Sequence, residues 1–274
     1  MNIKNFLAAS VGRTTLLSSL LLGASFSFLL SAPAYAKAGA ETDSRPNVLV
    51  ILADDLGYSD IASYGSEIST PNLDQLAQSG LRFSNYHTSA SCAPTRAMLL
   101  SGVDSHRAGV ANISEALTPD QAHSPFYRGT LNHNVVTIAT LLRDTGYNTS
   151  MAGKWHLGYE DESLLPINRG FEQTVTMPFS GGDNWTQQAY VPHYEKTLWF
   201  ENGEEITIPE DFYSSKFIVD KTIEQFENNR QKEKTKNKPF FSYVSFQAVH
   251  IPVHDEKAFT EKYIGTYIDG WDVL

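Results

Sequence analysis

The sequence predicts an α/β protein with a doubly wound, mostly parallel sheet flanked by helices. Residues 47–53 form an apolar run without alternation, as expected for a central strand buried on both faces of a parallel sheet. A second apolar run, residues 239–246, also ends in polar residues. Strand and helix patterns alternate between the two runs, which is typical of doubly wound folds.

The N-terminal residues predict a secretory signal peptide, residues 1–36. Lys4 and Arg13 give it a positive start, and an apolar run from Leu16 to Leu30 follows. Ala34-Tyr35-Ala36 is a small-x-small cleavage site, so we expect cleavage after Ala36 and a periplasmic or secreted protein without stable membrane insertion. An uncleaved anchor is the alternative, although the run is short and broken for a spanning helix. Residues 37–45 are a polar lead-in.

The charge of the chain argues against nucleic acid as a partner. The net charge is −10, and removing residues 1–36 lowers it to −12 because Lys4 and Arg13 are lost without any acidic residue. An acidic protein binds nucleic acid and anionic membranes poorly. An anionic substrate would therefore need a site made locally positive by a metal ion, arginine or lysine.

Asp54 and Asp55 end the first apolar run. Ligands of open α/β sheets gather at the carboxyl ends of the strands, which is where this pair falls. Adjacent carboxylates repel each other and are costly to desolvate, and a bound cation would remove that conflict. A solvated turn after the strand is the alternative interpretation.

The next elements lead to the only cysteine. Thr70 and Pro71 begin a predicted helix that ends at Gly80, and residues 81–87 are predicted as a strand. Pro94 is expected as the first residue of a helix that Gly102 ends.

Cys92 then lies just before a helix N-terminus, where free N–H groups and the macrodipole favour an anion. Arg96 is one turn further on, so its guanidinium can turn back toward the same point. A single cysteine excludes an internal disulfide. A small buried residue leading into a buried helix is the alternative interpretation of Cys92.

The remaining elements carry three further candidates. A helix over 135–143 and a strand over 147–152 precede Lys154 and His156, which face the same side if the segment is extended. A surface loop is the alternative interpretation of this Lys-x-His pair. A helix over 212–229 precedes the strand 239–246, which is followed by His250.

Four sequence motifs resemble the sulfatase family. Cys92-x-Pro94-x-Arg96, followed by Leu99-Leu100-Ser101-Gly102, is similar to the family signature. Gly153-Lys154-Trp155-His156-Leu157-Gly158 is similar to the second family motif, and Val249-His250-Ile251-Pro252 to the position of an active-site histidine. The stretches 70–74 and 80–83 look like those of an arylsulfatase. A cysteine-dependent phosphatase needs Cys-x5-Arg, but Met98 stands six residues after Cys92.

The resemblance implies that residues 46–274 are the N-terminal part of a sulfatase catalytic domain with an alkaline-phosphatase-like fold. It implies that a formylglycine-generating enzyme oxidises Cys92 to formylglycine, whose hydrate is the nucleophile. It also implies that Asp54, Asp55 and Cys92 ligate Ca²⁺. Hard carboxylate oxygens suit Ca²⁺, and the absence of a Cys/His ligand cluster argues against Zn²⁺.

The resemblance further assigns roles in hydrolysing a small-molecule sulfate ester. It implies that Arg96 holds the formylglycine and that Lys154 bridges it to the sulfate oxygens. It implies that His156 takes a proton from the hydrate and that His250 is the general acid. A phosphonate or phosphate ester hydrolase of the same superfamily is the alternative enzyme, and a fragment without turnover is the alternative outside enzymes.

Family members commonly run to twice this length, and an Asp-Asn pair on a later strand completes their calcium site. We therefore expect the remaining metal ligands beyond residue 274. Asp183-Asn184 lacks a preceding apolar strand and is interpreted as a loop.

Overall fold

The computed structural model describes residues 43–121, 123–253 and 256–266. These residues belong to one compact unit, Thr42–Leu274. The predicted signal peptide and residues 37–42 of the polar lead-in lie outside the described residues. No helix among the described residues is long and apolar enough to cross a membrane.

A six-stranded sheet with the strand order β1-β6-β2-β3-β4-β5 forms the centre of this unit. Its four longer strands, β1 (Val48–Leu52), β6 (Phe240–Ser245), β2 (Asn148–Lys154) and β3 (Gln173–Met177), are parallel to their neighbours. The short strands β4 (Trp199–Glu201) and β5 (Glu204–Ile206) add an antiparallel hairpin. The sheet is thus mostly parallel, as predicted.

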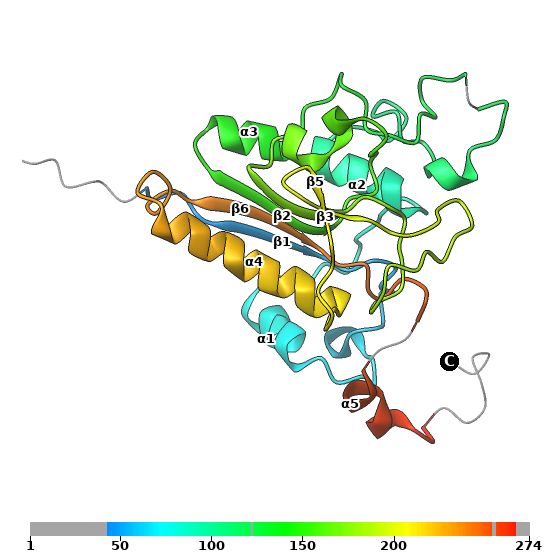
Figure 1. The fold of residues 1–274 in the computed structure, drawn as a ribbon. Helices are drawn as coiled ribbons and strands as arrows, with labels where there is room; N and C mark the ends of the chain where they lie inside the picture. Colours follow the sequence, from blue (N-terminus) through cyan, green and yellow to red (C-terminus); the bar gives the residue numbers. More distant parts are fainter. Residues whose placement is uncertain (1–42, 122, 254–255, 267–274) are drawn as a thin grey trace, which may run out of the picture. The chain divides into compact units, whose positions relative to one another are not determined.

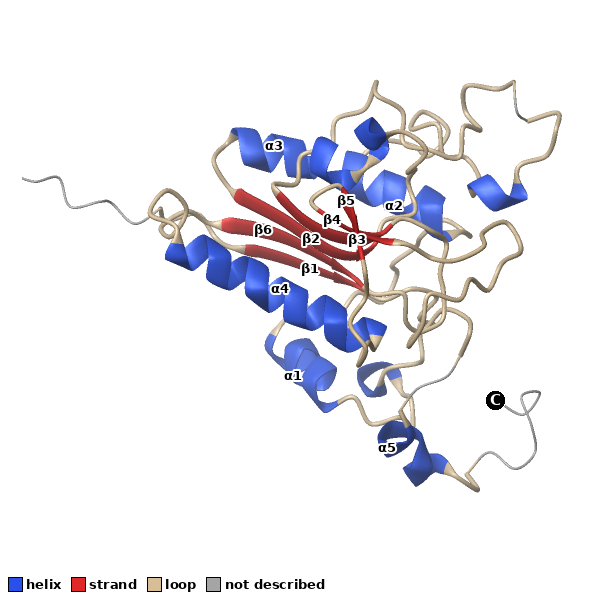
Figure 2. Ribbon diagram, in the orientation of Figure 1, coloured by secondary structure: helices blue, strands red, loops and turns tan. Residues whose placement is uncertain are grey.

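Helices cover both faces of the sheet (Figure 1 and Figure 2). α2 (Cys92–Ser101) and α3 (Ile138–Asp144) pack on one face, where Ala97, Ala139 and Met151 share a buried apolar cluster. α4 (Ser214–Gln231) packs on the other face, and its Ile218 joins a second cluster with Val175 and Val244. Two smaller helices are α1 (Pro71–Ser79) and α5 (Lys257–Thr260). Helices on both faces of a mostly parallel sheet confirm the predicted α/β class.

Two sequence predictions of strands need correction. β1 is not a central strand: within the described residues it pairs only with β6, and Leu49 and Ile51 are 48% and 54% exposed. Residues 81–87 form no strand, because no segment in the described part of the chain pairs with them and Leu81 and Phe83 stay exposed. An apolar sequence run does not indicate how many neighbouring strands will pair with it.

Helix and strand ends also differ by a few residues. Ser91 is the N-cap of α2, so Cys92 is its first residue and Pro94 its third rather than its first. The predicted strand 147–152 continues to Lys154, which makes that lysine the last residue of β2.

Candidate active site

The predicted site residues lie at the carboxyl ends of the parallel strands. Asp54 and Asp55 follow β1, Lys154 ends β2, and Cys92 begins α2. A cavity of about 140 Å³ is lined by Asp54, Asp55, Cys92, Arg96 and others. Lys154, His156 and His250 each contact one of these lining residues. The fold thus brings together all the residues that the motifs single out.

A buried ion-pair cluster centres on Asp54. Lys154 Nζ donates to Asp54 Oδ2, and Arg96 Nη2 lies 3.2 Å from Asp54 Oδ1. Their side chains are between 0% and 4% exposed. Burial opposes ionisation of Asp54, but the charges of Arg96 and Lys154 outweigh it and lower the pKa of that carboxyl. Two cations facing one carboxylate leave the cluster with an excess positive charge inside an acidic protein.

Arg96 is anchored through one end of its guanidinium. Its Nη1 donates to the Lys154 carbonyl at 3.0 Å, to the Tyr243 hydroxyl at 3.2 Å and to Ser245 Oγ. Its Nε and Nη2 are buried but make no hydrogen bond to any described residue. Nη2 is close enough to Asp54 for an ion pair, yet it is not aligned for a hydrogen bond. Buried N–H donors without a hydrogen-bond partner are uncommon in folded proteins.

Cys92 is paired with His156. The Cys92 Sγ lies 3.2 Å from His156 Nδ1. Burial alone would raise the pKa of the thiol, but the hydrogen bond to His156 and the charge of Lys154 lower it to about 7. Residue 92 is therefore held where a negative charge is stabilised.

His156 reaches Cys92 through a special backbone conformation. Its φ is +55°, in the left-handed region, so the segment after Lys154 is not extended, which was the condition for Lys154 and His156 to face the same side. Lys154 and His156 nevertheless both point into the cluster, Lys154 toward Asp54 and His156 toward Cys92.

Glu115 is a site residue that sequence reasoning missed. Its Oε2 lies 3.2 Å from His156 Nε2, and the hydroxyl of Tyr194 donates to its Oε1. Burial opposes ionisation, but the hydrogen bonds to His156 and Tyr194 lower the pKa of Glu115 to about 2. Glu115 lies 41 residues before His156 in the sequence, and Tyr194 lies 79 residues after Glu115. Neither residue belongs to a recognisable sequence motif. No local sequence signal could have linked them.

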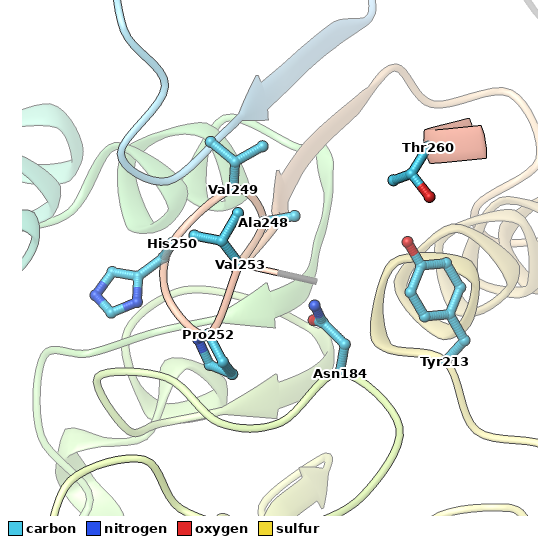
Figure 3. A pocket seen from close by; sticks show the side chains of 8 residues that line it. All are labelled: Asn184, Tyr213, Ala248, Val249, His250, Pro252, Val253 and Thr260. Carbon is cyan, nitrogen blue, oxygen red and sulfur yellow. The ribbon is translucent and has the colours of Figure 1, made fainter. Parts of the chain in front are cut away.

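Asp55 and His250 lie at the open side of the cluster. Asp55 has φ +59°, and its Oδ2 is 3.6 Å from His250 Nε2. The Tyr190 hydroxyl is 3.3 Å from the same nitrogen, while His250 Nδ1 donates to the Ile251 carbonyl at 2.7 Å. His250 also borders a second cavity of about 160 Å³. Figure 3 shows Asn184, Tyr213 and Thr260 across that cavity from the loop 248–253.

The described residues place two adjacent carboxylates, Asp54 and Asp55, where a cation could be held. Asp54 and Asp55 supply the hard carboxylate oxygens that Ca²⁺ prefers, but Ca²⁺ takes about six to eight oxygen ligands. No group of three or more His, Cys, Asp or Glu side chains in the described part of the chain could hold a metal ion. Asp183 and Asn184 lie in a loop, as predicted; Asp183 accepts backbone N–H groups there, and Asn184 accepts from Ser214 and Gln247.

The comparisons with known proteins agree with this fold. The family model described as Sulfatase matches residues 46–273. An arylsulfatase from Klebsiella aerogenes is 34% identical over 252 residues, which cover 91% of this chain and 52% of that protein. Human arylsulfatase A is 43% identical over 162 residues, 58% of this chain and 30% of that protein. This chain therefore spans about half the length of the first of these relatives, and less of the second.

Solved structures show the same relationship. The crystal structure of Ps i-CgsB in complex with k-i-k-neocarrahexaose matches with a TM-score of 0.66 and 27% identity, covering 83% of this chain and 50% of that one. A protein in complex with its substrate D-glucosamine-2-N,6-O-disulfate matches with a TM-score of 0.61 and 27% identity, covering 81% and 38%. A polar site at the carboxyl ends of the strands is where α/β folds of this kind bind their ligands. The chain belongs to the sulfatase family.

Proposed function

We propose that this chain carries the core of a sulfuric ester hydrolase whose nucleophile is made from Cys92. The observation that supports it most is the buried positive cluster of Arg96 and Lys154 beside the half-buried Cys92. A sulfate ester is an anion that repels nucleophiles, so the site must neutralise its charge before attack. The positive charges of Arg96 and Lys154 would supply that neutralisation.

The modification of Cys92 to formylglycine belongs to this proposal. A hydrated formylglycine supplies two hydroxyl groups on one carbon, so that attack through one leaves the other to expel sulfate and regenerate the aldehyde. His156 Nδ1, which faces residue 92, would accept the proton of the second hydroxyl. A plain serine or cysteine lacks that second hydroxyl and would stop after forming the sulfated enzyme.

His250 is the proposed general acid for the leaving alcohol or phenol. Its Nδ1 is committed to the Ile251 carbonyl, which leaves Nε2 as the nitrogen that faces Asp55 and Tyr190. A proton on Nε2 would therefore be delivered at the Asp55 side of the site.

We also propose that Asp54 and Asp55 hold a calcium ion together with ligands outside the described residues. Their carboxylates line the same cavity as Cys92, and their oxygen chemistry suits Ca²⁺. Bound calcium would act as a Lewis acid on a sulfate oxygen and lower the pKa of a hydroxyl on residue 92.

Substitutions at Cys92 test the nucleophile. We expect Cys92→Ala to abolish hydrolysis of an aryl sulfate, and Cys92→Ser to release at most one phenol per chain, because serine cannot expel the bound sulfate. The measurement is phenol release against protein concentration, with Ser79→Ala at the end of α1 as the control that keeps wild-type turnover. Steady turnover by either Cys92 variant contradicts the assignment. An aryl phosphonate assayed beside the sulfate separates this function from a phosphonate hydrolase.

One mass measurement on exported protein tests both processing proposals. We propose that the signal peptide directs the chain to the periplasm or beyond, and that Cys92 is then found as an aldehyde. The expected protein lacks residues 1–36, and its Cys92 peptide carries an aldehyde in place of the thiol. An intact N-terminus contradicts the first proposal, and a free thiol in an active protein contradicts the second.

A further inference from the structure

His156 uses both of its ring nitrogens, and only one of them faces Cys92. Nδ1 lies 3.2 Å from Cys92 Sγ, and Nε2 lies 3.2 Å from Glu115 Oε2. The ring is 3% exposed, so no bulk water competes for either nitrogen. The proton on this ring is therefore placed by these two neighbours.

The chemistry of a carboxylate decides where that proton sits. An ionised carboxylate can only accept hydrogen bonds, so a neutral imidazole facing it must carry its proton on Nε2. Nδ1 is then left with a lone pair directed at residue 92. The opposite tautomer would place N–H toward residue 92, and it could not accept a proton from it.

Glu115 is itself fixed from two sides. Tyr194 donates its hydroxyl to Oε1, and Ser114 Oγ donates to Oε2 at 2.9 Å. Tyr194 is held in turn by ring contacts with Phe179 and Tyr159, at centroid distances of 4.5 and 6.4 Å. A buried carboxylate with these donors stays ionised and stays in place.

We propose that Glu115, held by Tyr194, is a positioning residue that fixes His156 in the tautomer with Nδ1 free to accept a proton from residue 92. The effect on turnover rests on the proposed function, whereas the tautomer can be measured in the unmodified chain. Glu115 is not among the residues that line the cavity beside Cys92, and it acts only through His156. The requirement is a carboxylate, because an amide could donate to Nε2 as well as accept from it.

The first experiment reads the tautomer by nitrogen-15 NMR of histidine in a Cys92→Ala background, which removes the partner on the Nδ1 side. The His156 signals are assigned with His156→Gln. The spectra are taken at a pH where the ring is neutral, and with Glu115 present we then expect the proton of His156 on Nε2. Glu115→Gln should shift the population toward Nδ1 protonation, and the matched change Glu172→Gln should not. Glu172 accepts from Thr149 near the opposite end of β2. Unchanged His156 signals in Glu115→Gln overturn the proposal.

The second experiment measures turnover on an aryl sulfate with Cys92 intact. Glu115→Gln should lower kcat by about 10²-fold, the usual range for losing general-base catalysis, with KM changed much less. Tyr194→Phe, which keeps the carboxylate and the ring, should show a smaller loss in the same direction. A rise in KM as large as the fall in kcat overturns the proposal, and so does a wild-type kcat in Glu115→Gln. If the wild-type chain shows no turnover, the proposed function is contradicted but the proposal for Glu115 is not. The NMR experiment then decides the role of Glu115.

Discussion

The Asp54 carboxylate offsets part of the cost of burying two positively charged side chains, Arg96 and Lys154. Burying an ion is unfavourable unless it is paired, and Asp54 pairs with both Lys154 and Arg96. Burial and the neighbouring charge of Arg96 lower the pKa of Lys154, which opposes its charged state. Arg96 and Lys154 thus share a single paired carboxylate, and a bound anionic substrate would favour the charged form of Lys154.

This charge balance predicts opposite effects for two substitutions. Asp54→Asn leaves two buried cations without a carboxylate, and we expect it to lower the free energy of unfolding by about 3–5 kcal/mol. Lys154→Met leaves the Arg96–Asp54 pair balanced, so we expect stability equal to wild type or higher, together with loss of turnover. Urea denaturation of both variants measures the difference. A Lys154→Met protein that is as unstable as Asp54→Asn would show that the cluster has no excess charge.

At the scale of elements, the close approach of β2 and β6 depends on Gly153. Its φ is +109°, and a Cβ there would lie 1.9 Å from the Ser245 carbonyl oxygen of β6. Ser245 and Lys154, which flank this contact, both bind Arg96. The glycine thus lets two strands meet where they position the site.

Substituting Gly153 should destabilise the fold by more than backbone strain alone would, because the added Cβ would also clash with Ser245. We expect Gly153→Ala to lower the free energy of unfolding by about 2–5 kcal/mol, from left-handed strain plus overpacking. Gly65→Ala is the matched control, since Gly65 has φ +110° but nothing within 4 Å of the added carbon. The control should cost about 1–2 kcal/mol. Equal losses in the two variants, measured by thermal or urea unfolding, would argue against the clash.

The sequence carried the local motifs but not the contacts between distant segments. The polar residues after β1 and β2 were predictable, because ligands gather at the carboxyl ends of parallel strands. Glu115 and Tyr194 were not predictable, since both lie in segments without strand or helix periodicity. Asn202-Gly203 did carry a signal, because this pair with positive φ is a typical hairpin turn and joins β4 to β5. The edge position of β1 required knowing which strands pair, and apolar composition cannot supply that.

At the scale of the whole described unit, one face of the sheet is incompletely covered. Val48, Val50 and Leu52 of β1 pack on the cluster that includes α2 and α3, so Leu49 and Ile51 point to the opposite face. α4 covers β2 and β6 on that face. Leu49 and Ile51 remain about half exposed beside it, as do Val219 and Ile223 of α4. An apolar strip beside an open strand edge is a site where another chain can pair.

This strip predicts self-association of the chain. We expect the 274-residue chain to form oligomers that grow with concentration, and Ile51→Lys to reduce them, because a charge on an edge strand opposes edge-to-edge pairing. Light scattering after size-exclusion chromatography measures the mass. Ile264→Lys is the matched control, since Ile264 is 82% exposed but lies outside the sheet. If Ile264→Lys lowers the mass as much as Ile51→Lys, association is driven by general hydrophobicity rather than by the edge of β1. A monomeric wild-type chain at all concentrations would mean that the open edge is protected in solution.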